Sequence, residues 1–298
     1  MELKRITIDS KALFDQYYQY CPPKCSYLSF ANLFIWKDAE DIAFFEYNDL
    51  LIVTGKSLYN GKRYFMVPIG KGLCHKVIPM LAANFGEDFS IYGITEQDKI
   101  LLSEKCSNQL TIVRERDMDN YVYLSEKLIN LSGKKLHSKR NHINKFKDKY
   151  NYTYERLDHL NIRELLQFKK NWYLEKETDP TLELEKKAID NALSYYVELN
   201  LICGMIKVDG KIVAFSIGEQ LNEDTALIHI EKADISYDGA YAIMNNEFVK
   251  NEWSHLKYIN REDDMGLEGL RKAKLSYQPD LMVEMYSASI NEEQERGE

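Results

Sequence analysis

The sequence is poor in cysteine and offers no pattern typical of a metal site. Its five cysteines are an odd number at sparse spacing, which favours reduced thiols over a disulfide framework: Cys21, Cys25, Cys74, Cys106 and Cys203. The first two form a CPPKC segment, but no second pair of ligands stands at the spacing that zinc requires. We therefore expect thiols without a disulfide or a metal.

Long apolar runs are also missing. No stretch approaches the roughly 20 apolar residues that a membrane helix needs. The beginning, MELKRITIDSKALF, lacks the apolar core of a secretory signal. We expect a cytoplasmic protein without a transmembrane segment.

The chain is long, contains many tyrosines and has a net negative charge. Its 298 residues predict two domains, since a domain typically holds roughly 100–200 residues. Apolar residues make up 45% and charged residues 29%, which is typical of a folded protein. The 21 tyrosines suit pocket walls and interfaces, because tyrosine has an apolar body and a polar tip.

Net charge is unevenly spread along the chain. The net charge is −8, yet residues 134–149 hold seven Lys and Arg against one acid, a local +6 that leaves −14 for the rest. This balance argues against a general nucleic-acid coat and favours a local contact with a phosphate-bearing molecule.

That segment also predicts a long amphipathic helix, Lys134–Tyr150. Leu136, Ile143, Phe146 and Tyr150 fall on one face of it. The basic face, which includes Lys139 and Arg140, could contact the phosphates of coenzyme A or the acceptor end of a tRNA. A solvated helix between two halves is the alternative.

The first half alternates strands and helices, as a mixed α/β sheet does. Turn signals at Asn48-Asp49 and Asn60-Gly61 separate three strand-like runs. The predicted elements are helices Lys11–Tyr20 and Tyr27–Lys37, strands Ile42–Tyr47, Leu50–Thr54 and Tyr64–Ile69, helix Lys76–Phe85, strand Phe89–Ile94, helix Glu96–Cys106, and strands Leu110–Arg114 and Tyr121–Leu124.

The second half repeats this pattern around a β-meander. Asp209-Gly210, between two apolar runs, is a strong hairpin signal. The predicted elements are helices Ile162–Glu175 and Leu184–Leu199, strands Leu201–Val208, Lys211–Gln220 and Thr225–Asp234, helix Ala240–Trp253, strand Tyr258–Arg261, helix Leu267–Leu275 and strand Leu281–Tyr286.

We therefore expect mixed α/β architecture in four parts. They are an N-terminal domain with a structural role (1–124), linking helices with a basic face (125–150), a C-terminal domain with the active site (151–290), and a charged, disordered tail (291–298).

Three segments resemble a known family: LSGKKLHSKRNHINKF (131–146), IHIEKADISYDGAY (228–241) and YINREDDMGLEGLRKAKLSYQP (258–279). They are similar to the family of the phosphatidylglycerol lysyltransferase C-terminal domain. The resemblance implies two tandem GNAT-like domains, as in the Fem aminoacyltransferases. It also implies a donor that is either an acyl-CoA thioester or an aminoacyl-tRNA. The lipid-modifying relatives carry a membrane-embedded half ahead of this domain, which this sequence does not show, so a soluble acceptor is at least as good an expectation.

The resemblance places a donor cradle at the turn after the third meander strand. In GNAT proteins the amides at the start of the next helix hold the donor's pyrophosphate. Gly239 fits this pattern, whereas Ser236 and Tyr241 depart from it. A plain turn is the alternative. The cradle would comprise Ser236, Asp238, Gly239, Ala240 and Tyr241.

The same resemblance suggests catalytic residues. Strand alternation puts His229 and Glu231 on one face, with Ile228 and Ile230 on the other. A carboxylate beside an imidazole could act as a general base toward an amine. Tyr277 could protonate the leaving group. Alternatively, His229 and Glu231 bond only each other, and Tyr277 is a core aromatic.

An acidic run, Arg261–Asp264, ends the next strand, where ligands often bind in α/β sheets. Arg261, Asp263, Asp264 and, from the following helix, Arg271 could bind a cationic acceptor or aminoacyl group. A solvated loop with a helix cap is the alternative.

These patterns lead to one main hypothesis and one alternative. The main hypothesis is an acyltransferase or aminoacyltransferase that moves a group from acyl-CoA or aminoacyl-tRNA to an amine or hydroxyl. Glu231 would be the base, and Arg140 or Arg261 would anchor a phosphate or carboxylate. The alternative is a non-catalytic module that binds a ligand or RNA.

Overall fold

The structure is a computed structural model that describes residues 2–58, 60–72, 76–106, 109–174 and 180–290. The tail 291–298, for which we predicted disorder, lies outside the described residues. The chain divides into two compact units. Unit 1 is Met1–Asp119 with Val283–Glu298, and unit 2 is Asn120–Met282.

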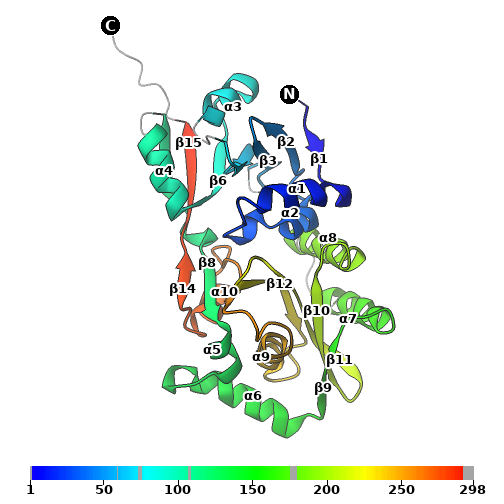
Figure 1. The fold of residues 1–298 in the computed structure, drawn as a ribbon. Coiled ribbons are helices and arrows are strands. Elements are labelled where there is room, and N and C mark those ends of the chain that lie inside the picture. Colours follow the sequence, from blue (N-terminus) through cyan, green and yellow to red (C-terminus); the bar gives the residue numbers. More distant parts are fainter. Residues whose placement is uncertain (1, 59, 73–75, 107–108, 175–179, 291–298) are drawn as a thin grey trace. The chain divides into compact units, whose positions relative to one another are not determined.

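Unit 1 is a mixed sheet with helices packed against it (Figure 1). Its strand order is β1-β2-β3-β4-β6-β15-β7, with β5 paired to β3. Asn48 and Asp49 both have positive φ and form the predicted turn between β2 and β3. The elements are β1 (Lys4–Arg5), η1 (Ile8–Ser10), α1 (Lys11–Tyr18), η2 (Ser26–Leu28), α2 (Phe30–Trp36), β2 (Ala43–Tyr47), β3 (Leu50–Lys56), β4 (Arg63–Met66), β5 (Ile69–Gly70), α3 (Val77–Phe85), β6 (Ser90–Thr95), α4 (Glu96–Cys106), β7 (Leu110–Arg114), η4 (Arg116–Met118) and β15 (Met285–Ile290).

Unit 2 has the predicted order of two helices, a three-stranded meander, helix, strand, helix and strand. Asp209 and Gly210 have positive φ and close the predicted hairpin. A strand before the helices, β9, was not predicted. The elements are β8 (Asn120–Leu124), α5 (Ser125–Asn130), η5 (Lys134–Leu136), α6 (His137–Lys149), β9 (Tyr152–Arg156), α7 (Ile162–Leu174), α8 (Pro180–Ser194), β10 (Ile202–Val208), β11 (Lys211–Gln220), β12 (Thr225–Ala233), α9 (Ala240–Glu252), β13 (Tyr258–Asn260), α10 (Glu268–Leu275) and β14 (Leu281–Val283).

Helices cover both faces of the unit 2 sheet. On one face, Gly204 and Gly218 leave room for the ring of Phe248 from α9. On the other, Phe168 of α7 packs against Phe215, with ring centroids 6.0 Å apart. Helix α6 buries its predicted apolar residues in the same core as α9, so its expected amphipathic packing is confirmed.

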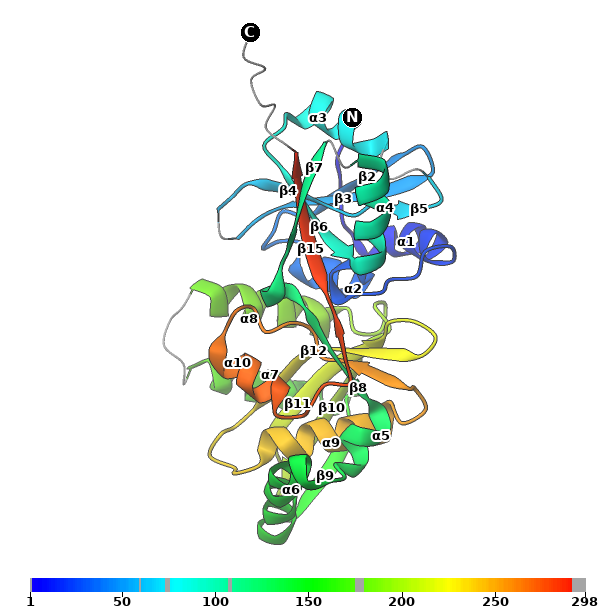
Figure 2. The same cartoon turned by 90° about the vertical axis from the view of Figure 1, so that its left-hand side faces the viewer.

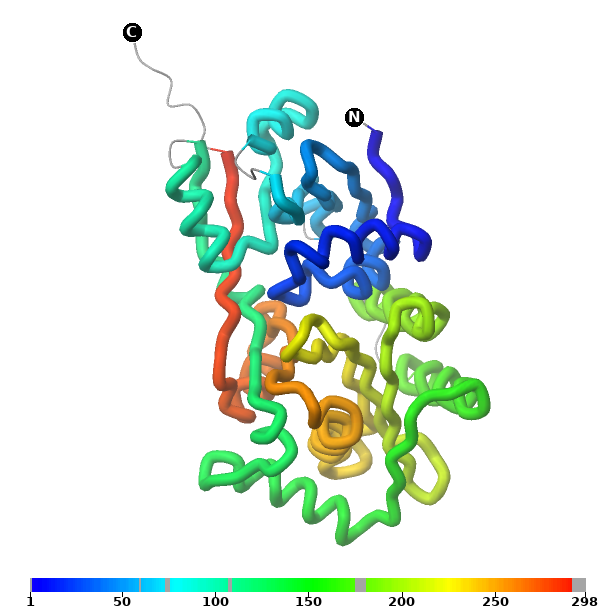
Figure 3. Tube along the Cα trace, viewed as in Figure 1, coloured from blue at the N-terminus to red at the C-terminus, as the bar shows by residue number. Residues whose placement is uncertain are grey.

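The two sheets exchange strands. Strand β8 follows β7 in sequence but lies between β14 and β13, whereas β15 follows β14 and lies between β6 and β7. Figure 2 shows β15 beside β7, and the trace in Figure 3 crosses from one unit to the other in green after β7 and in red before β15. The unit limits therefore differ from the limits predicted at 124 and 150, because the residues of a strand do not reveal which sheet it joins.

Candidate functional site

The parallel strands β12 and β13 separate in the middle of unit 2. They pair from Thr225 with Tyr258 to Leu227 with Asn260, and β12 then continues to Ala233 without this neighbour. We call the region beyond Leu227, where β12 no longer pairs with β13, the β12–β13 gap. Side chains from both strands and from α9 occupy it.

A β-bulge changes which side chains enter the gap. Gly218 pairs with Ile228 and Ile217 pairs with Ile230, so His229 is an extra residue in β12. Because of it, Glu231 faces α9, while His229 contacts residues on the opposite face. The prediction that His229 and Glu231 share one face is therefore wrong, since alternation fails at a bulge.

His229 is a buried cation held by two carboxylates. Its Nδ1 lies 3.0 Å from Glu262 Oε1 and its Nε2 lies 3.1 Å from Glu219 Oε1, and its side chain is 1% exposed. Burial alone would lower the pKa of His229, but the two carboxylates outweigh it and raise the pKa to about 9. At neutral pH both ring nitrogens carry protons, so this imidazole has no lone pair with which to act as a base.

Glu231 instead forms a buried group with Arg261 and Asn245. Arg261 Nη2 lies 3.2 Å and 3.4 Å from the two carboxylate oxygens, and Asn245 Nδ2 donates to Oε2 at 3.2 Å. Two buried atoms of this group have no hydrogen-bond partner in the described residues: Arg261 Nη1 and Asn245 Oδ1. Unpaired buried polar atoms are costly and often mark functional sites, so this pair is the strongest evidence for a ligand in the gap.

Two tyrosines and a lysine surround this group. The Arg261 guanidinium lies 4.9 Å from the Tyr277 ring centre and 5.8 Å from that of Tyr123, and Lys139 Nζ lies 4.3 Å from the Tyr277 ring. Burial, offset in part by the Arg261 charge, raises the pKa of Tyr277 to about 12. Tyr277 is thus a buried aromatic, and its role as a proton donor stays a prediction.

Asp264 and Arg271 are bound to each other. Arg271 donates to both oxygens of Asp264, from Nε at 2.9 Å and from Nη2 at 2.8 Å, and Tyr121 also donates, at 2.5 Å. The Asp264 side chain is fully buried. These hydrogen bonds hold the loop and α10 in place. They do not by themselves indicate a contact with a substrate. The adjacent Asp263 accepts from the Met265 amide at 2.8 Å.

Asn245 and Lys274 are site residues that the sequence analysis missed. Lys274 is buried and donates to the carbonyls of Arg261 and Asp263, which fixes the backbone beside the gap. Burial lowers its pKa to about 8. A signal for Asn245 did exist: Asn245, Asn246 and Glu247 are consecutive polar residues in a helix that is buried on all sides.

Gly239 has a structural reason to be glycine. Its φ is +89°, and a Cβ there would lie 2.6 Å from the carbonyl oxygen of His142 in α6. Asp238 also faces this helix, 3.6 Å from His142 Nδ1. The glycine is thus explained by α6, and a donor cradle at Ser236–Tyr241 stays a prediction.

We expect Gly239→Ala to destabilise the protein by about 2 kcal/mol, from a left-handed backbone and a displaced α6. The control is Gly210→Ala, where φ is +77° but no atom lies within 4 Å of the added Cβ. That variant should lose only about 1 kcal/mol, the backbone part. Urea unfolding of both variants gives the comparison. Equal losses would mean that α6 does not require the glycine.

Arg140 does not reach the gap. Its Nη1 donates to the carbonyls of Leu131 and Gly133, the latter at 2.8 Å, and so closes the turn between α5 and α6. Of the two predicted phosphate contacts, only Lys139 lies beside Tyr277 and Arg261.

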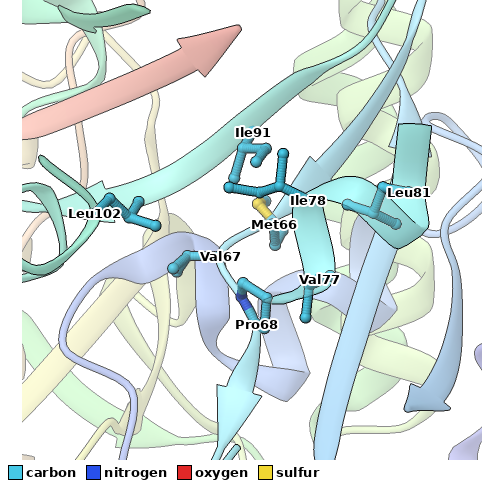
Figure 4. A pocket seen from close by; sticks show the side chains of 8 residues that line it. All are labelled: Met66, Val67, Pro68, Val77, Ile78, Leu81, Ile91 and Leu102. Atoms are coloured by element: carbon cyan, nitrogen blue, oxygen red, sulfur yellow. The ribbon is translucent and has the colours of Figure 1, made fainter. Parts of the chain in front are cut away.

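The corresponding place in unit 1 is apolar. There β4 and β6 are also parallel and α3 lies between them in sequence, as α9 does between β12 and β13. Figure 4 shows the cavity at this place, of about 10 Å³, lined only by apolar residues: Met66, Val67, Pro68, Val77, Ile78, Leu81, Ile91 and Leu102. A cavity this small and apolar is a packing defect with no group to act on a substrate.

Within the described ranges, no helix combines the length and apolarity needed to cross a membrane. The described residues also bring together no group of three or more His, Cys, Asp or Glu suited to a metal ion.

The chain is similar to several known proteins. Residues 20–289 match the family described as "Phosphatidylglycerol lysyltransferase, C-terminal". A conserved protein of unknown function from Bacteroides thetaiotaomicron is 33% identical, with 98% of this chain and 100% of that chain covered and a TM-score of 0.90. An uncharacterized protein of Mycoplasmoides gallisepticum is 27% identical over 178 residues, which span 57% of this chain and 56% of that protein.

Two more distant structures share the fold. L-PGS from Bacillus licheniformis is 17% identical, with 93% and 91% of the two chains covered and a TM-score of 0.65. FemX is 9% identical, with 98% of both chains covered and a TM-score of 0.63. The predicted mixed α/β fold in two units is confirmed, and L-PGS and FemX share it.

Proposed function

Because the chain belongs to the family of the phosphatidylglycerol lysyltransferase C-terminal domain, we propose that unit 2 transfers an acyl or aminoacyl group from an activated donor to an amine or hydroxyl. The reaction takes place in the β12–β13 gap. The observation that carries this proposal is the buried group of Glu231, Arg261 and Asn245, with one donor and one acceptor unpaired.

The unpaired atoms fit an aminoacyl group better than a simple acyl group. Arg261 Nη1 is a donor suited to a carbonyl oxygen, and Asn245 Oδ1 is an acceptor suited to an ammonium. An α-aminoacyl ester presents both, whereas an acetyl thioester presents only the carbonyl. We therefore favour aminoacyl-tRNA over acyl-CoA as the donor.

Glu231 takes two roles in this proposal. It holds Arg261 toward the carbonyl, so that the guanidinium stabilises negative charge as the acceptor attacks the carbonyl carbon. Its oxygens keep further lone pairs, and one of these receives the proton that the acceptor loses. The bond from the carbonyl carbon to the donor oxygen then breaks, the proton held by Glu231 passes to that oxygen, and the donor leaves as its free hydroxyl.

The basic helix would contact the tRNA. Lys134, Lys135 and Lys145 are exposed, which suits contact with phosphates. Contacts of this kind weaken steeply with salt and do not depend on sequence.

The test is equilibrium binding of 3′-lysylamino-3′-deoxyadenosine, a stable analogue of the aminoacyl end of a tRNA. We expect Asn245→Leu to weaken binding by about tenfold, because the ammonium loses its acceptor. The Nα-acetylated analogue, which lacks the α-ammonium but keeps the ε-ammonium, should bind weakly to both proteins. Lys145→Met, which is on the basic helix and makes no described contact with the gap, is the control and should leave binding unchanged.

Transfer is tested separately with radiolabelled lysyl-tRNA and acetyl-CoA as donors. Glu231→Gln should lose transfer while still binding the analogue. If neither donor changes the melting temperature and the analogue does not bind, the proposal fails. Analogue binding without any transfer would instead indicate a non-catalytic module.

A further inference from the structure

Lys139 differs from the other cations of the basic helix in what it contacts. Its ammonium lies over the buried Tyr277 ring, and the described residues give it no hydrogen bond or ion pair. Lys147, in contrast, lies 3.5 Å from Glu247, and Arg140 binds backbone carbonyls. Burial lowers the pKa of Lys139, the Arg261 charge lowers it further, and Glu231 raises it.

Lys139 and Arg261 therefore both lie against the ring of Tyr277. Their charges lie 4.3 Å and 4.9 Å from the centre of Tyr277, and Glu231 is the carboxylate that acts on both. Two cations and one carboxylate leave a charge of +1 at a place where water is partly excluded. An aromatic face stabilises each cation, but the repulsion between the two remains.

The group also has hydrogen-bond donors to spare. Arg261 Nη1 is buried without a partner, and Lys139 Nζ has three protons to donate. A singly charged anion with several oxygens would neutralise the +1 and accept from both side chains. A phosphodiester has this charge and these oxygens, whereas a phosphomonoester would bring nearly two charges.

We propose that Lys139 and Arg261 form a binding site for a phosphodiester over the Tyr277 ring. The proposal rests on the proposed function in one respect: the phosphodiester is part of the donor or acceptor that enters the β12–β13 gap. Lys139 is the half-exposed member of the pair, and its flexible stem moves aside to admit the anion to Arg261 Nη1.

The experiment is titration of the full-length protein with dimethyl phosphate, the smallest phosphodiester, followed by NMR at low salt. We expect Lys139→Met to raise the dissociation constant by at least about tenfold, because a charge-assisted hydrogen bond is lost. Lys139→Arg should restore binding to within about threefold. Lys211→Met removes the same charge from an exposed position at the start of β11, outside the site and outside the basic helix, and should change nothing.

Two further ligands distinguish the source of the phosphodiester. A CCA trinucleotide represents the end of a tRNA, and dihexanoyl phosphatidylglycerol below its micellar concentration represents a lipid headgroup. We expect Lys139→Met to weaken the binding of one of these two ligands, and that ligand identifies the source of the phosphodiester. Acetate carries the same charge as dimethyl phosphate, and we expect it to bind more weakly because it has fewer oxygens.

Two results would overturn the site: equal losses in Lys139→Met and Lys211→Met, or no binding of any phosphodiester by the wild type. Both are independent of the proposed function, because the lysylamino analogue has no phosphate. Analogue binding that depends on Asn245, without phosphodiester binding, removes this inference alone. Phosphodiester binding that depends on Lys139, without analogue binding or transfer, removes the proposed function alone.

Discussion

Replacing Asp264 with alanine is expected to lower the free energy of unfolding by about 3 kcal/mol, the lower end of the range for breaking a buried ion pair. We take the lower end because the Arg271 side chain is 33% exposed and water can partly solvate it after the change. The hydroxyl of Tyr121, however, is buried and would lose its acceptor. The Gly266 amide, which donates to Asp264 Oδ1 at 3.0 Å, would lose one too.

Asp263→Ala is the matched control. Asp263 is the neighbouring acid in the same loop, and the change removes the same carboxylate from a more exposed position, where it accepts from one amide. We expect a loss below about 1 kcal/mol. Urea unfolding at neutral pH measures both variants. If they lose the same amount, Asp264 has no special structural role, and its place in substrate binding would need to be considered again.

The sequence was sufficient for much of the fold because its signals there are local. Asp209-Gly210 predicted a hairpin because few residue pairs adopt two successive positive φ values. The spacing of Leu136, Ile143 and Phe146 predicted the buried face of α6. Neither signal depends on what lies elsewhere in the chain.

The exchange of β8 and β15 could not be predicted in this way. A strand's residues indicate that it is extended and which face is apolar, but its partners are set by backbone hydrogen bonds that any sequence can make. Tyr121–Leu124 was therefore expected as a strand but assigned to the first half, although it pairs with β13.

The structure brings two of the predicted site residues together, but the sequence did not predict their contacts. Glu231 and Arg261 lie together as a pair, 3.2 Å apart, at the strand ends where we expected chemistry. The bulge at His229 then separated the imidazole from Glu231, because one extra residue reverses the alternation that the prediction assumed. Asp264 and Arg271 lie together and bind each other, and their role in substrate binding stays a prediction.

Histidine 229 should make the stability of the protein depend on pH. Its pKa is about 9 in the folded state, against an ordinary value of 6.5, so the folded protein binds the proton more tightly than the unfolded chain does. The resulting stabilisation is complete below about pH 6.5 and is lost as the pH rises through about 9. A shift of this size corresponds to about 3 kcal/mol.

The variant His229→Gln should remove this dependence. It also removes the cation that lies between Glu219 and Glu262, so we expect it to be about 3 kcal/mol less stable than the wild type at pH 6.5. The difference should shrink steadily toward pH 9.5, because the wild type loses its cation there. Urea unfolding between these pH values measures the difference directly.

The proper measure is the difference in unfolding free energy between the wild type and His229→Gln, because Lys274 has the opposite effect on stability. Burial lowers its pKa to about 8, so the unfolded chain binds its proton more tightly, and this group makes the folded state more stable as the pH rises above 8. Lys274 is present in both proteins, so most of its contribution cancels. His255→Gln, which changes an exposed histidine of the same unit, should run parallel to the wild type at every pH. If the difference in unfolding free energy between the wild type and His229→Gln stays constant up to pH 9.5, His229 is not the buried cation that the two carboxylates imply.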